Sequence, residues 1–176
     1  MKKIFFSITS IFLLAITFAF TVATTWKIGP KYNISFSTSG VSGIFKTFTG
    51  TVVFDEQSLP TSKFDVSIDV NSINTGNGMQ NKHAKSAEWF DAAKYPAIKF
   101  TSKKIVKTAT GYTAVGDLQV HGISKEVSLP FVFKRAGAGG TFEGAFNISR
   151  NDFKVGEPGG EVGEVIKVNV SVPVTK

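Results

Sequence analysis

The sequence predicts an all-β domain of eight antiparallel strands, either closed into a barrel or packed as a sandwich. Apolar and polar residues alternate with period two along most of the chain, which is typical of strands with one buried and one wet face. Turn-forming clusters separate these stretches at hairpin spacing, and no helix lies between them to make parallel crossovers. A length of 176 residues suits one domain.

The alternation is clearest in KFDVSIDV, where Phe64, Val66, Ile68 and Val70 share one face and polar residues occupy the other. Seven more stretches show a similar pattern, and each is expected to be one strand. In chain order the eight predicted strands cover residues 33–38, 43–54, 63–70, 97–106, 112–120, 126–133, 141–148 and 165–174.

Turns are expected at Leu59–Ser62, Thr108–Gly111, Gly137–Gly140 and Gly156–Gly160, which are rich in glycine, proline and small polar residues. A closed barrel would leave no exposed strand edge, and eight strands leave room for one small ligand.

Three glycines, Gly50, Gly116 and Gly144, fall on the apolar face of their strands. Each marks either a bend at a barrel corner or a missing side chain that widens an interior groove. Both interpretations favour a curved barrel over a flat sheet.

One region, residues 71–96, breaks the hairpin rhythm. Residues 81–90 contain helix formers, and Tyr95-Pro96 stops a helix because the residue before proline avoids helical angles. Trp89 and Phe90 need another surface to cover. We therefore expect a short helical capping segment, residues 81–90, that closes one mouth of the barrel.

Residues 1–23 resemble a secretory signal peptide. Lys2 and Lys3 precede an apolar run from Ile4 to Phe20, and small residues follow at Thr21 to Ala23. The alternative is an uncleaved membrane anchor, but the run is at the short limit for crossing a bilayer. We expect cleavage, which leaves residues 24–176 as the domain and lowers the formal charge from +7 to +5.

The composition offers little catalytic chemistry. The chain has no cysteine, two distant histidines, His83 and His121, and no G-x-S-x-G stretch. We expect no enzymatic activity, no metal and no cofactor. The lysines are scattered along strands without an aromatic-basic stripe, so nucleic acid is not an expected partner. Transient contact with a membrane surface and the oligomeric state stay open.

The predicted interior is rich in aromatic residues, since most of the phenylalanines after residue 23 fall on the inward parity. Either these side chains fill the barrel themselves, or they line a lumen that holds an apolar ligand. Periodicity alone does not separate the two.

Several motifs together resemble the YceI-like family. The stretches are SINTGNGMQNKHAKSAEWFDAAKYPAIKFTS from Ser72, GDLQVHGISKEVSLPF from Gly116, FNISRNDFKVG from Phe146 and the opening YNISFSTSGVSGIFKTFTGTVVFD. The resemblance implies a lipocalin-like antiparallel barrel that is exported to the periplasm and binds an isoprenoid lipid or isoprenoid quinone in its lumen. The chain departs from the family pattern at Ala84, at Trp89 and at Lys31-Tyr32.

The candidate binding residues form two groups. The polar end of a ligand is expected at Ser72, Asn81, His83 and Arg150. The apolar lumen and lid are expected to comprise Phe36, Phe54, Phe64, Val66, Ile68, Met79, Trp89, Phe90, Ile98, Phe100, Leu118, Leu129, Phe131 and Phe146. The alternative function is a protein- or anionic-surface-binding module with a self-filled core.

Overall fold

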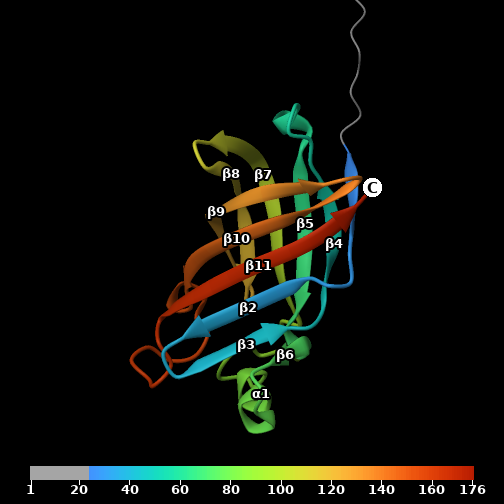
Figure 1. Cartoon of the computed structure of the whole chain (residues 1–176). Coiled ribbons are helices and arrows are strands. Elements are labelled where there is room, and N and C mark those ends of the chain that lie inside the picture. The colour runs from blue at the N-terminus through green and yellow to red at the C-terminus, as the bar shows by residue number, and fades with distance from the viewer. Residues whose placement is uncertain (1–23) are drawn as a thin grey trace, which may run out of the picture.

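The computed structural model describes residues 24–176, so the predicted signal peptide lies outside the described residues. One short α-helix joins the strands (Figure 1), together with single-turn 3-10 helices that are written η1 to η3 below. The elements are β1 (Thr25–Ile28), β2 (Asn33–Thr38), β3 (Val41–Phe45), β4 (Phe48–Val53), η1 (Leu59–Thr61), β5 (Lys63–Asp69), η2 (Val70–Ser72), β6 (Ile73–Asn74), α1 (Gly78–Ala84), β7 (Ala97–Thr108), β8 (Gly111–Val120), β9 (Ile123–Ala136), β10 (Gly139–Ser149), η3 (Asn151–Phe153) and β11 (Val165–Thr175).

The sheet closes into a barrel of eight antiparallel strands, as predicted. The ring runs β1, β4, β5, β7, β8, β9, β10 and β11, and it returns to β1 where Ile28 pairs with Val174. Segments β2, β3 and β6 continue β1, β4 and β5 after short breaks, because β2 also pairs with β11, β3 with β2 and β6 with β3. Three of the eight strands are therefore broken in two.

Gly50 allows β4 and β5 to approach each other closely. It pairs with Val66 on β5 and has a φ of 138°, a conformation that favours glycine. A Cβ at this position would lie 2.2 Å from the Asp65 carbonyl oxygen. The close approach of β5 therefore explains this glycine, rather than a widened interior groove.

The strand β9 serves both halves of the barrel wall. Its first part pairs with β8 as far as Phe131, and its last part pairs with β10 from Val132 to Ala136. The β9–β10 ladder ends next to Pro130, whose carbonyl oxygen faces Gly144 of β10. A proline has no N–H to continue a ladder on that side.

One end of the barrel is closed by packed aromatic rings. Phe54 is 1% exposed, and its ring centroid lies 5.1–6.3 Å from those of five other aromatic residues. The Trp26 indole Nε1 donates a hydrogen bond of 2.9 Å to the Phe54 carbonyl oxygen. This aromatic plug consists of Trp26, Phe54, Phe64, Tyr112, Phe131, Phe133 and Phe142.

The opposite end carries α1, which projects beyond the strands (Figure 1). The helix covers Gly78–Ala84, so the prediction of helix over residues 81–90 was wrong at both limits. The Asn77 side chain accepts hydrogen bonds from the Met79 and Gln80 amides and starts the helix early. Residues 85–90 form turns instead, in which the Phe90 amide donates to the Ala84 carbonyl.

Within residues 24–176, no helix combines the length and apolar character needed to cross a membrane.

Candidate ligand-binding site

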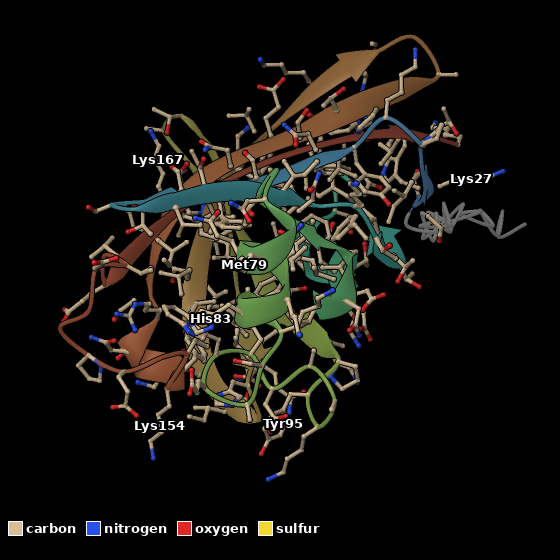
Figure 2. All side chains as sticks on the ribbon, turned by 90° about the horizontal axis from the view of Figure 1, so that it is seen from below. Lys27, Met79, His83, Tyr95, Lys154 and Lys167 are labelled. Atoms are coloured by element: carbon tan, nitrogen blue, oxygen red, sulfur yellow. The ribbon has the colours of Figure 1, made fainter. Side chains whose placement is uncertain are left out.

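A cavity of about 1100 Å³ occupies the barrel between the aromatic plug and α1. The cavity reaches the surface beside α1. Met79 of this helix borders the opening and is 82% exposed to solvent. Figure 2 looks at this end, with Met79 and His83 on the helix in front of the barrel. We call this opening the mouth.

Most of the predicted apolar residues border the cavity. Several of them, including Val66 and Phe131, are only half-buried, because they face open space rather than a neighbouring side chain. The predicted residues that line it are Phe36, Phe64, Val66, Ile68, Met79, Trp89, Phe90, Ile98, Phe100, Leu118, Leu129, Phe131 and Phe146. Their contact with a ligand stays a prediction.

Phe54 does not line the cavity, contrary to expectation. Its side chain is buried inside the barrel, as the alternation predicted. However, Phe54 directly follows β4 and lies at the closed end of the barrel. There it packs against Phe64 and Phe142 within the aromatic plug. It supports the floor of the cavity from behind.

The mouth contains a cluster of three side chains centred on Trp89. The Trp89 Nε1 donates a hydrogen bond of 2.7 Å to His83 Nε2, so the histidine nitrogen is the acceptor. The Arg150 guanidinium lies 5.3 Å from the centroid of the Trp89 ring, and Gly156 packs closely against the same ring. Trp89 therefore links the α1 region to the loop that follows β10.

Arg150 borders the cavity, but most of its donors are already used. The residue is 4% exposed, and its guanidinium donates to the carbonyls of Val155, Glu157, Val162 and Gly163 at 2.9–3.2 Å. These bonds hold the loop between β10 and β11 in place. The guanidinium can offer a ligand little beyond its charge.

The two other predicted polar residues lie away from the cavity. Ser72 Oγ donates to the Asp69 carbonyl at 2.6 Å and accepts from the Thr47 amide at 3.0 Å. Asn81 Oδ1 accepts from the backbone and side chain of Thr75. Both side chains stabilise the chain around the break after β5, so His83 is the predicted polar residue best placed to meet a ligand.

Sequence reasoning missed part of the lining. The apolar alternation of β11 already indicated Val168, Val170 and Val172, but Phe153 and Val155 come from an irregular loop without periodicity. The polar residues at the cavity edge also lack a pattern. They are Ser35, Ser67, Thr75, Asn77, Gln80, Glu88, Glu143, Glu157 and Glu161.

The closed end carries a half-buried tyrosine, Tyr112, whose hydroxyl has a shifted pKa. Burial raises the pKa of the Tyr112 hydroxyl, and the nearby Glu56 carboxylate adds to the effect. Arg135 donates to Glu56 Oε2 at 2.7 Å and 3.1 Å, so the pair braces this end. Among residues 24–176, no group of three or more potential ligating side chains is arranged to hold a metal ion.

Comparison with known proteins places these features in context. Residues 20–174 match the YceI-like domain family. Protein YceI of Salmonella newport is 33% identical over 146 residues, which cover 77% of this chain and 74% of that protein.

Solved structures show the same architecture. BcnA of Burkholderia cenocepacia superposes with a TM-score of 0.79 at 28% identity, over 85% of this chain and 100% of that one. A polyisoprenoid binding domain from Saccharophagus degradans superposes with a TM-score of 0.60 at 14% identity, over 88% of this chain and 99% of that domain. The second similarity concerns the fold alone. The predicted closed antiparallel barrel is confirmed.

Proposed function

The chain belongs to the YceI-like domain family, and from that premise we propose that it is an exported protein that sequesters an isoprenoid or isoprenoid-quinone-like lipid in its barrel. The observation that carries the proposal is the cavity of about 1100 Å³, whose walls are formed mainly by apolar side chains. The isoprenoid class follows from the family resemblance and is the class named for the polyisoprenoid binding domain that shares this fold.

Burial of the apolar chain would supply most of the affinity. Each five-carbon unit removed from water contributes roughly 4 kcal/mol, from about 0.8 kcal/mol per carbon. A few units therefore outweigh the cost of ordering the ligand, and the polar end needs few partners. His83, Thr75 and Gln80 border the cavity near its mouth and are the groups available to orient that end.

We propose binding rather than catalysis as the activity. The cavity walls combine apolar side chains with scattered polar groups, and burial of a ligand there requires no chemical step. The alternative of a self-filled barrel that binds a protein or an anionic surface is less well supported, because inward residues such as Val66 and Phe131 are half-buried beside open space.

Native mass spectrometry of protein purified gently from its own host tests the proposal. We expect a complex whose excess mass, after release and fragmentation, yields the five-carbon ladder of an isoprenoid. A fatty acid or phospholipid in its place would contradict the isoprenoid class while keeping lipid binding. A clean apo mass, together with failure to take up a prenyl alcohol offered in detergent, would contradict lipid binding itself.

A further inference from the structure

A second, more open depression lies on the other side of α1 from the barrel cavity. It is formed by the helix, the turn that follows it and the chain around Asn71 and Ala92. Its lining residues are Asn71, Met79, Lys82, His83, Lys85, Ser86, Ala92 and Ala93. Met79 and His83 border both spaces, so α1 separates this depression from the mouth.

The depression has the charge of an anion site. Lys82 and Lys85 line it, no lining residue is acidic, and neither lysine belongs to any ion pair formed within residues 24–176. The nearest acidic residue in sequence, Glu88, borders the barrel cavity instead. An anion here would meet two cations without competition from a carboxylate in the lining.

Phosphate is an anion that suits this depression, because two lysines can donate charge-assisted hydrogen bonds to its oxygens. Ser86 also lines the depression, but its Oγ is buried, so Lys82 and Lys85 carry the contact.

Met79 indicates that the phosphate belongs to a membrane phospholipid rather than to a free ion. Its residue surface is 82% exposed, the largest value among the exposed large hydrophobic residues of the described chain. It lies on α1, the helix that projects beyond the strands at this end of the molecule (Figures 1 and 2). An exposed apolar side chain beside two lysines suits the boundary between headgroups and acyl chains in a bilayer.

We propose that α1 is a membrane-docking element. The depression beside Lys82 and Lys85 takes the phosphate of an anionic phospholipid, and Met79 enters the bilayer surface. Docking in this orientation turns the mouth of the barrel toward the membrane. The acidic loop residues Glu157 and Glu161 border the barrel cavity but do not line this depression.

Vesicle flotation with the full mature protein tests the proposal. We expect the protein to float with phosphatidylcholine vesicles that contain roughly 30 mol% phosphatidylglycerol, but not with pure phosphatidylcholine, and to dissociate as salt rises. The variant Lys82→Glu/Lys85→Glu should lose at least about thirtyfold in partitioning, since each lysine near an anionic surface contributes roughly fivefold and the new carboxylates add repulsion.

A matched control separates the site from net charge. Lys104→Glu/Lys107→Glu makes the same charge change near the far end of β7, where both lysines are exposed and outside any ion pair within residues 24–176. This control should lose less than about threefold, because only long-range attraction changes. Equal losses in the two variants would overturn the proposal, as would equal binding to pure phosphatidylcholine.

Two further arms distinguish the source of the phosphate and the state of the barrel. Inorganic phosphate that binds at α1 in solution, with no vesicle binding by the same protein, would overturn the membrane assignment. Uptake of a prenyl probe from detergent should be unchanged in both double variants. Vesicle binding that survives in a protein without probe uptake would leave α1 docking standing while the proposed lipid carriage fails.

Discussion

At the scale of single residues, Val66 tests whether the barrel wall faces a ligand. It pairs with Gly50 and Phe100 and borders the cavity. In Val66→Asp the carboxylate stays hydrated while the cavity holds water, but an apolar ligand would strip that water away. Because desolvation of a polar group costs at least about 2 kcal/mol, we expect probe affinity to fall by roughly thirtyfold or more.

The control for this change is Thr49→Asp, at an exposed position of β4 that does not border the cavity. Probe affinity should be unchanged there, as measured by fluorescence titration. Equal affinities for the two aspartate variants would show that Val66 does not meet the ligand.

The raised pKa of Tyr112 predicts that the folded protein loses stability at alkaline pH. Its pKa is raised in the folded protein, mainly by burial. An unfolded tyrosine ionises near about pH 10, so above that pH the unfolded chain releases a proton that the folded chain retains. The stabilising contribution is therefore present below about pH 10 and is lost as pH rises toward the folded pKa.

Tyr112→Phe should flatten this alkaline decline in the free energy of unfolding, measured by urea denaturation between about pH 8 and 11. Glu56→Gln removes the second cause of the shift and should give an intermediate slope. The same slope in wild type and Tyr112→Phe would assign the decline to other groups.

At the scale of elements, residues 81–90 are the segment that we expect to close the mouth. Trp89→Ala removes the hydrogen bond to His83 and the contact with Arg150. We expect ligand release to accelerate by about tenfold, since roughly 1.4 kcal/mol of closure contacts are lost. The ligand-free protein should lose less than the 3–5 kcal/mol that is typical when a fully buried aromatic residue is truncated.

Trp26→Phe is the matched control at the closed end. It removes the Trp26 hydrogen bond to the Phe54 carbonyl, so it should lower the free energy of unfolding without altering the release rate. Stopped-flow transfer to empty vesicles and urea melts measure the two quantities. A large stability loss in Trp89→Ala with unchanged release would identify its ring as core packing.

The elements also show what the sequence could specify. Period-two alternation assigned the inward faces, since Phe64 and Val66 border the cavity as predicted. Alternation does not report the position of a residue along the barrel axis. Phe54, which is sealed in the plug, therefore follows the same pattern as Val66, which borders the cavity. The helix start depended on the Asn77 side chain, a contact that helix propensity does not reveal.

The polar end was less predictable for a related reason. Ser72 and Asn81 are hydrophilic and lie close in sequence to residues of the mouth. Each side chain is already hydrogen-bonded to the local backbone, to Asp69 and to Thr75 respectively. Arg150 gathers four carbonyls from a loop whose path no periodicity describes.

At the scale of the whole molecule, the export proposal concerns residues 1–23. We predict that the mature protein begins near Thr24 and accumulates in the periplasm, because Lys2 and Lys3 precede an apolar run and a small-residue site. Intact-mass measurement of the periplasmic fraction checks this. Lys2→Glu/Lys3→Glu should slow processing, whereas a retained Met1 in the membrane fraction would contradict the prediction.

The end of the β9–β10 ladder at Pro130 has a mechanical consequence for the whole barrel. Near the plug, these strands are joined from Glu143↔Val132 to Gly139↔Ala136, whereas β10 continues along β11 to Ser149. The part of the wall nearest the mouth can therefore widen along this seam without breaking a β9–β10 hydrogen bond. Under the proposed function, lipid chains of different width would fit at the mouth. The paired strands near the plug would still hold the end of each chain. Amide exchange should therefore be slower at Val132 than at Ser128. The Pro130 carbonyl faces β10, so strand alternation turns both of these N–H groups to that side, and only Val132 lies within the β9–β10 ladder.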